Sequence, residues 1–311
     1  MNTIQNIVVT GRMYRELEPL LRQRSDKSFR FLAEADLTAE DYDWADAFVG
    51  FRPPPGFRLE GLQWVHALGA GVDAFVHGRE WLPGVLLTRT IGVFGRQISE
   101  YCLSYMLAEA QHHGRFRAQQ RERSWVPHTP RPLAGQTAVI FGTGTIGQEV
   151  ARQLSFFGMQ VSGVSRSGSR KPYFASNVTL ASCSGLLESA DWVINTLPLT
   201  RETNQLFDER LFGAMKQSGF IHVGRGASVK PEALLRALDA GQVRLAVLDV
   251  FAEEPLAESS PLWDHPGIIV TPHISAVTGP GEAAADFLKV LDGVDKGMPP
   301  KEHLVDLQQG Y

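Results

Sequence analysis

Cysteine is scarce in this sequence, because its 311 residues include only Cys102 and Cys183. Each lies among apolar or small residues, without a nearby metal-ligand partner. Disulfide frameworks and zinc clusters both need several cysteines at regular spacings, so two isolated thiols argue against both. We therefore expect two small buried hydrophobic residues and no metal site.

Long apolar runs are also missing. No stretch approaches the roughly 20 apolar residues of a membrane span, and the N-terminal MNTIQNIVVTGR lacks the basic and apolar regions of a signal peptide. Neither sign of charge dominates: a net charge of −4, with 43% hydrophobic and 21% charged residues, is typical of a soluble globular protein. We therefore expect a cytoplasmic protein that binds neither nucleic acid nor membranes.

The length and the pattern of strands predict two α/β domains. Single cores stop growing near roughly 250 to 300 residues, which favours two domains here. Strand-like runs alternate with helical patterns, which predicts parallel sheets. Four runs lie in the first third (NIVVT, AFVGF, QWVHAL, VLLTRT) and six lie from residue 137 onward (TAVIF, QVSGVS, DWVINTLP, GFIHVGRG, VRLAVLDVF, GIIVTPHI). Between the two sets, the segment from Ile98 predicts a long helix and WVPHTPRPLAG a linker.

A glycine-rich segment, GTGTIG, follows the predicted strand TAVIF and begins a helix. Gly142 would allow a tight turn, Gly144 would let the backbone approach a pyrophosphate, and Gly147 would let helix and strand pack closely. The start of the helix, including Thr145 and Ile146, would offer free N–H donors to an anion. The segment predicts a dinucleotide site; the alternative is a turn that is merely rich in glycine.

The acidic residue that binds the adenosine ribose in NAD enzymes is missing. It would be expected about 20 residues beyond the glycines, at the end of the second strand, where this sequence has Ser165, Arg166 and Ser167. An arginine with neighbouring hydroxyls suits the 2′-phosphate of NADP(H), with help from Arg170 or Lys171. We predict a preference for NADP(H), with NAD(H) possible as a cofactor; the alternative is a solvated basic loop.

Three residues of catalytic type follow three of the predicted strands: Arg225, Glu254 and His273. Ligands of open parallel sheets bind at the carboxyl ends of the strands, where the glycine loop also lies. Arginine can hold a carboxylate and polarise the neighbouring carbonyl, and a histidinium paired with glutamate can donate a proton as hydride arrives. Alternatively, the three are an arginine in a turn, a glutamate that caps a loop and a structural histidine.

At these residues the sequence resembles the D-isomer-specific 2-hydroxyacid dehydrogenases, in particular the glyoxylate/hydroxypyruvate reductases. The similarity includes HALGAGVD, GTGTIG, NTLPLTRETNQLFD, HVGRGASV, LDVFAEEPL, PLWDHPGIIVTPHISAVT and the C-terminal VDLQQGY. The resemblance implies that Arg225, Glu254 and His273 are catalytic. It also implies that the amides around Ala70, Gly71 and Val72 bind the substrate carboxylate, and that cofactor contacts include Leu197, Pro198, Gly224 and Asp249, the last near the nicotinamide amide.

The same resemblance implies a discontinuous architecture: a Rossmann-type doubly wound domain (residues 99–284) inserted in a smaller flavodoxin-like substrate domain (residues 1–98 and 285–311). It also implies a homodimer built mainly through the cofactor domain. The expected activity is NADPH-dependent reduction of small 2-oxo acids, with glyoxylate and hydroxypyruvate as leading candidates. Two alternatives stay open: another 2-oxo acid such as phenylpyruvate or pyruvate, and a non-enzymatic, corepressor-like module that senses NAD(P).

Overall fold

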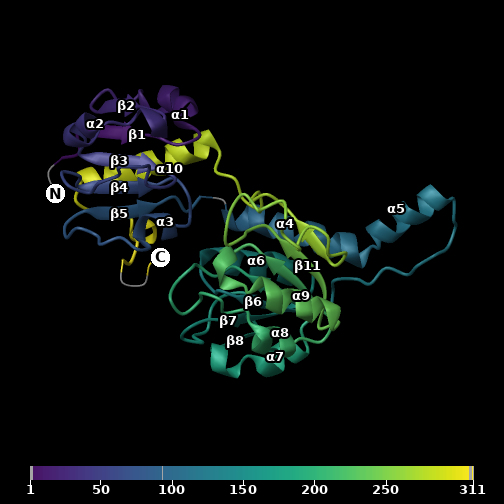
Figure 1. The fold of residues 1–311 in the computed structure, drawn as a ribbon. Helices are drawn as coiled ribbons and strands as arrows, with labels where there is room; N and C mark the ends of the chain where they lie inside the picture. Colours follow the sequence, from purple (N-terminus) through teal and green to yellow (C-terminus); the bar gives the residue numbers. More distant parts are fainter. Residues whose placement is uncertain (1–2, 93, 308–309, 311) are drawn as a thin grey trace. The chain divides into compact units, whose positions relative to one another are not determined.

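The chain forms two compact units, Met1–Phe94 with Thr278–Tyr311, and Gly95–Val277 (Figure 1). The computed structural model describes residues 3–92, 94–307 and 310, so Gln308, Gln309 and Tyr311 of the VDLQQGY motif lie outside the described residues. The sequence analysis expected the domain boundaries at 98/99 and 284/285. In the structure the two boundaries lie earlier in the chain, at 94/95 and 277/278. The second difference arises because the whole of α10 (Pro280–Asp295) packs in the first unit.

The first unit contains a five-stranded sheet, and all of its paired strands are parallel. The strand order β2-β1-β3-β4-β5 is the flavodoxin-like order, as the sequence predicted. The strands are β1 (Asn6–Val9), β2 (Ser28–Phe31), β3 (Ala47–Gly50), β4 (Trp64–Ala67) and β5 (Leu86–Arg89). The helices are α1 (Tyr14–Leu21), α2 (Ala39–Trp44), α3 (Asp73–Val76) and α10, with 3-10 turns η1 (Glu34–Asp36) and η4 (Lys301–His303).

Alternating side chains of this sheet form two cores. One core contains buried residues of α1 and α10, including Leu17 and Phe287, and the Phe287 ring stacks on Trp64 of β4 at 5.3 Å between centroids. The other core is centred on Phe48, Phe57 and Phe75. Helix α10 therefore belongs to the first unit, although more than 180 residues separate it from β5 in the chain.

The second unit contains a seven-stranded parallel sheet, with strand order β12-β11-β10-β9-β6-β7-β8. Chain order reverses between β6 and β9, which is the topological switch point of a doubly wound sheet. The strands are β6 (Thr137–Phe141), β7 (Gln160–Val164), β8 (Ser176–Val178), β9 (Trp192–Asn195), β10 (Ser218–His222), β11 (Val243–Leu248) and β12 (Ile268–Val270).

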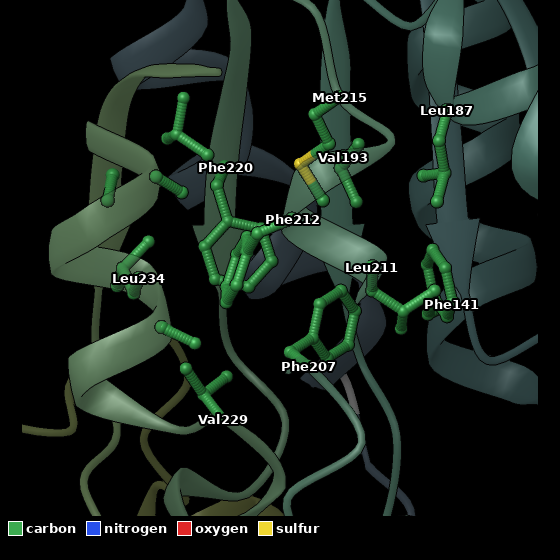
Figure 2. Packing of buried hydrophobic residues seen from close by; sticks show 14 of the residues in the cluster. Phe141, Leu187, Val193, Phe207, Leu211, Phe212, Met215, Phe220, Val229 and Leu234 are labelled. Carbon is green, nitrogen blue, oxygen red and sulfur yellow. The ribbon is translucent and has the colours of Figure 1, made fainter. Parts of the chain in front are cut away.

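One face of this sheet is covered by a core that contains four packed aromatic side chains. Phe141 and Phe220 of the sheet meet Phe207 and Phe212, with ring centroids 4.8 to 5.8 Å apart along the series (Figure 2). Leu187, Leu211 and Leu234 complete this core from three helices: α7 (Ser184–Glu188), α8 (Glu209–Gly213) and α9 (Pro231–Asp239). The other elements are α6 (Thr145–Phe156) and the 3-10 turns η2 (Leu180–Ser182) and η3 (Gly226–Ser228).

The helix expected at Ile98 is α4 (Phe94–Ala110), which buries Ile98, Cys102 and Met106. It is followed by α5 (His113–Glu122), which extends away from the sheet, and none of its ten residues is buried (Figure 1). Both cysteines are free and buried, as predicted, and burial raises the pKa of the Cys102 thiol to about 12. None of the described helices is long and apolar enough to cross a membrane.

Two strands escaped the sequence analysis, β2 and β8. Both are edge strands of three or four residues without a fully buried side chain. β8 (SNV) has no apolar alternation, and the alternation of β2 (SFRF) includes only two apolar residues. Helix α6 ends at Phe156, and Phe157 lies beyond its end and is 39% exposed. Gly158 follows with φ +80°, a left-handed conformation that glycine adopts readily at helix ends.

Candidate active site

The glycine loop follows β6 at the switch point. Gly142 has φ +101°, and a Cβ atom there would lie 2.6 Å from Thr196 Oγ1. A Cβ at Gly147 would lie 1.9 Å from the Gly142 carbonyl oxygen. Glycine is therefore needed at both positions, for a left-handed turn and for close packing of helix on strand.

Gly144, in contrast, has no protein atom within 4 Å of the place where its Cβ would be. It precedes α6, and the first backbone bond of that helix runs from Gln148 N to Gly144 O at 2.9 Å. The N–H groups of Thr145, Ile146 and Gly147 precede this bond and lie in the first turn, where amides point at an anion. The loop thus combines open space with donors, which fits the pyrophosphate of a dinucleotide.

The basic turn lies next to this loop. Gly142 N donates to Val164 O at 2.9 Å, and Ser165 follows immediately. Ser165 Oγ accepts from Gly168 N at 3.2 Å, which closes a turn whose Arg166 and Ser167 side chains are exposed. Arg170 and Lys171 are also exposed. The end of β7 therefore presents hydroxyls and cations. Ser165 occupies the position at which NAD enzymes carry a carboxylate.

The loop after β9 holds Leu197 and Pro198. Leu197 N donates to Asn195 Oδ1 at 3.0 Å, and Thr203 Oγ1 donates to Pro198 O at 2.6 Å. A Cβ at Gly224 would lie 2.6 Å from Leu197 O, so glycine lets the loops after β9 and β10 touch. Leu197, Pro198 and Gly224 are therefore neighbours in this unit.

Arg225 follows Gly224 and is partly buried, with Nη1 2.9 Å from Gly224 O. A buried polar network lies beneath it. Asn195 Nδ2 donates to Ser228 Oγ at 2.8 Å, and Ser228 Oγ donates to Arg225 O at 2.7 Å. The backbone that carries the guanidinium is therefore tied to the end of β9.

His222 completes this network. Asn195 Nδ2 lies 3.1 Å from His222 Nδ1, and because an amide nitrogen only donates, Nδ1 is the acceptor and the ring is neutral. Burial lowers the pKa of His222 to about 4, although bonds with backbone groups of the Arg225 loop oppose the shift. Sequence reasoning missed Asn195, His222 and Ser228 because short polar residues at strand ends have no distinctive pattern.

Glu254 and His273 form a hydrogen-bonded pair. His273 Nδ1 lies 2.8 Å from Glu254 Oε2, and Phe251 N donates to Glu254 Oε1 at 2.9 Å. A carboxylate accepts, so Nδ1 carries a proton in this pair, and Nε2 is the nitrogen that can deliver a proton to another group. Both side chains are open to solvent, at 36% for Glu254 and 48% for His273.

Asp249 is fully buried immediately after β11, and it holds the loop that carries His273. Its Oδ1 accepts from Thr271 Oγ1 at 2.6 Å and from Ile274 N at 2.8 Å, and its Oδ2 accepts from Ser275 N at 2.8 Å. The family resemblance implied that Asp249 lies near the nicotinamide amide, and that contact stays a prediction. In the structure, the Asp249 side chain accepts three hydrogen bonds within its own unit.

The remaining candidate residues lie in the first unit, after β4. Ala70 and Gly71 are partly buried, and Val72 is buried at the start of α3. Arg89 Nη1 donates to Ala70 O at 3.1 Å, and Thr278 Oγ1 donates to Leu68 O at 3.1 Å. Because C=O and N–H point in opposite directions across a trans peptide, these two bonds also orient the N–H groups of Gly69 and Gly71.

Within the second unit, the structure brings the glycine loop, Arg225, Glu254 and His273 to one edge of a single parallel sheet, each after a different strand. No group of three or more potential metal ligands occurs among the described residues. A glycine loop at the switch point of a doubly wound sheet defines the class: a Rossmann-type dinucleotide-binding unit.

Comparison with known proteins identifies the family. The family described as "D-isomer specific 2-hydroxyacid dehydrogenase, NAD binding domain" matches residues 103–275. The chain is 34% identical to the glyoxylate/hydroxypyruvate reductase A of Serratia proteamaculans over 279 residues, which is 86% of this chain and 88% of the relative. The chain therefore belongs to the D-isomer specific 2-hydroxyacid dehydrogenases, a family of oxidoreductases.

Solved structures agree over almost the whole chain. A D-isomer specific 2-hydroxyacid dehydrogenase from Xanthobacter autotrophicus Py2, in complex with NADPH and MES, has a TM-score of 0.90 at 30% identity and covers 99% of this chain and 100% of its own. An NADPH-dependent glyoxylate/hydroxypyruvate reductase from Sinorhizobium meliloti, in complex with NADP and sulfate, has a TM-score of 0.86 at 27% identity with the same coverage. The predicted family, fold class and enzyme class are thus confirmed, whereas the residue roles stay predictions.

Proposed function

We propose that this enzyme is an NADPH-preferring reductase of small 2-oxo acids, with glyoxylate and hydroxypyruvate as its leading substrates. One observation carries the proposal: the His273–Glu254 pair, with its 2.8 Å bond, lies at the sheet edge that also carries the glycine loop. A proton donor and a dinucleotide site on one sheet edge suit reduction of a carbonyl.

In the proposed reaction, bound NADPH supplies the hydride. His273 Nε2 donates a proton to the carbonyl oxygen, and Glu254 accepts from the opposite ring nitrogen and fixes the orientation of the ring. Arg225 holds the substrate carboxylate and polarises the carbonyl, supported by the Asn195–Ser228 bonds beneath it. The amides around Ala70, Gly71 and Val72 in the first unit are further candidates for binding a substrate carboxylate.

The cofactor preference depends on the turn after β7. Ser165 leaves no carboxylate to repel a 2′-phosphate, and Arg166 and Ser167 are exposed beside the glycine loop, which suits charge-assisted bonds to phosphate. The crystal structures of the Xanthobacter and Sinorhizobium relatives, with NADPH and NADP, support this assignment. NADH remains a weaker alternative cofactor.

The substrate assignment rests on the names of relatives such as the Serratia glyoxylate/hydroxypyruvate reductase A. It is tested by following NADPH absorbance with a panel that includes glyoxylate, hydroxypyruvate, pyruvate and phenylpyruvate, run with NADPH and NADH in parallel. We expect the highest kcat/KM with glyoxylate or hydroxypyruvate and NADPH. Highest activity with phenylpyruvate or pyruvate would make that acid the assigned substrate. Binding of NADPH that is not oxidised in the presence of any of these acids would favour the non-enzymatic alternative.

We also propose that the protein is a homodimer. Helix α5 and the residues after it leave a group of apolar side chains in solvent, with Phe116 38%, Trp125 97% and Val126 48% exposed. Contiguous exposed apolar patches mark interaction surfaces, and we infer that these side chains belong to such a patch. A second copy of the chain is the proposed partner.

A further inference from the structure

A chain of buried hydrogen bonds runs from α4 to the loop that carries His273. The Tyr101 hydroxyl lies 2.6 Å from Thr271 Oγ1, which lies 2.6 Å from Asp249 Oδ1. A carboxylate only accepts, so the single proton of the threonine hydroxyl goes to Asp249, and Tyr101 must donate to Thr271. In this series of hydrogen bonds, the tyrosine therefore donates to the threonine and the threonine donates to the carboxylate.

Asp249, at the end of this series of hydrogen bonds, holds the backbone around His273. Asp249 accepts from Ile274 N and Ser275 N at 2.8 Å each through its side chain, and its carbonyl oxygen accepts from His273 N at 2.9 Å. His273 itself has φ +53°, a left-handed conformation that is unfavourable for a residue with a side chain. Bonds from Asp249 to three successive N–H groups hold the loop in this conformation.

Burial makes each bond of the chain matter. Asp249 is fully buried, and Thr271 and Tyr101 are each 9% exposed, so water cannot replace a lost donor without rearrangement. Burial also raises the pKa of Tyr101 well above its usual value, which keeps the hydroxyl protonated. The titratable groups that act on Asp249 electrostatically are Tyr101, Cys102 and Tyr105 from α4 and His222 from β10.

We propose that Tyr101 and Thr271 are positioning residues for His273: through Asp249, they hold its ring in line with Glu254 for proton donation. This inference rests on the proposed function, in which His273 is the acid. Thr271 acts through its hydroxyl rather than its size, because it is the hydroxyl that joins Tyr101 to Asp249.

The test compares Thr271→Val, which removes the hydroxyl at constant shape, with Thr271→Ser, which keeps it. Thr137→Val is the control, since the Thr137 hydroxyl also lies between acceptors, with Oγ1 2.6 Å from Ser189 O and 3.0 Å from an Asp191 carboxylate oxygen. It lies at the start of β6 and thus at the opposite edge of the sheet. We expect Thr271→Val to lower kcat about tenfold, the size of effect that one hydrogen bond to a charged group carries. The solvent deuterium isotope effect should rise, because proton donation becomes slower.

The other expected results separate positioning from general damage. The Kd of NADPH and the KM of glyoxylate should change by less than about twofold in Thr271→Val, and Thr271→Ser should recover most of kcat. Thr137→Val should lose stability but keep kcat and the isotope effect. Tyr101→Phe should reproduce the Thr271→Val kinetics in weaker form, and it provides the test if Thr271→Val does not fold.

A readout independent of turnover uses the ¹⁵N resonances of the histidine ring, with the His273 signal assigned by its loss in His273→Ala. Thr271→Val should broaden or shift this signal, and Thr137→Val should not. The inference is overturned if Thr271→Val keeps wild-type kcat and an unchanged His273 signal, or if Thr271→Ser is as impaired as Thr271→Val. Wild-type turnover of His273→Ala would instead overturn the proposed function, whatever the ring signal does.

Discussion

Gly226 packs directly against the backbone of Phe251, so closely that a Cβ atom at Gly226 would lie 1.9 Å from the Phe251 carbonyl carbon. Gly226 follows Arg225, and the N–H of Phe251 donates to Glu254 Oε1 at 2.9 Å. The loop that carries the proposed anchor of the substrate and the loop that carries the partner of the proposed acid are therefore in contact through a glycine.

This contact predicts a large effect of Gly226→Ala. The methyl group must push the two loops apart, which we expect to lower kcat/KM about 10²-fold and to destabilise the protein by about 1 to 3 kcal/mol. Steady-state kinetics and urea unfolding measure the two effects. Gly213→Ala in α8 is the control, because a Cβ there would meet no atom within 4 Å, and we expect it to keep wild-type kinetics.

Removal of the proposed acid should separate chemistry from binding. We expect His273→Ala to lose about 10² to 10⁴ in kcat, the usual contribution of a general acid, and to keep the Kd of NADPH. Glu254→Gln should lower kcat less, since the amide oxygen can still accept from Nδ1 but carries no charge. Turnover and NADPH fluorescence measure both variants, and turnover of His273→Ala at the wild-type rate would be incompatible with the assignment.

The turn after β7 should control cofactor choice. In Ser165→Asp/Arg166→Gln, a carboxylate can accept from the ribose of NADH and would repel the 2′-phosphate of NADPH, so we expect the ratio of kcat/KM for NADPH to that for NADH to fall about tenfold or more. Single variants Arg170→Ala and Lys171→Ala show whether either side chain also binds the phosphate. An unchanged ratio in the double variant would exclude this turn as the phosphate site.

Acid should destabilise the second unit through His222. Burial lowers the pKa of His222 to about 4, below the value of 6.5 for an exposed histidine. Between these two pKa values, the histidine is protonated in the unfolded chain but neutral in the folded chain. The free energy of unfolding therefore decreases as the pH falls from about 6.5 toward 4, by about 3 kcal/mol in total for this residue. Burial lowers the pKa of His66 in the first unit to about 3, which acts in the same direction.

His222→Gln tests this cause, because its amide oxygen can accept from Asn195 Nδ2 but does not titrate in this range. The free energy of unfolding, measured in urea between pH 7 and pH 4.5, should fall less steeply with acid in the variant than in the wild type. Parallel curves would show that another group is responsible.

The exposed apolar group around α5 should determine the oligomeric state. We expect light scattering to show a dimer for the wild type. The Trp125→Ser/Val126→Ser dimer should already dissociate at protein concentrations at which the wild type is still dimeric. Phe156→Ser is the control, since Phe156 is also a largely exposed aromatic residue, at 85%, but is located at the end of α6. A monomeric wild type, or a greater effect of Phe156→Ser, would contradict the proposal.

Much of the cofactor unit was predictable from the sequence, because its constraints leave local marks. Gly142 needs a left-handed φ and Gly147 needs close packing, and only glycine meets both needs, so the motif is visible without a structure. Buried parallel strands such as β6 and β10 are continuous apolar runs, which the pattern of hydrophobic residues also reveals. Edge strands β2 and β8 bury too little to leave such a pattern.

Other features were decided only by tertiary structure. Tyr101 and Thr271 are 170 residues apart, and Asn195 and Ser228 are 33 apart, so no spacing in the sequence relates either pair. The division of the chain before α10 likewise depends on Phe287 stacking on Trp64. The sequence alone determined which chemical groups reach the carboxyl edge of the sheet, because strand and loop chemistry is local. Which polar side chains hold those groups in place depended on the packing of distant segments, because a buried hydrogen bond needs a partner that only the folded chain supplies.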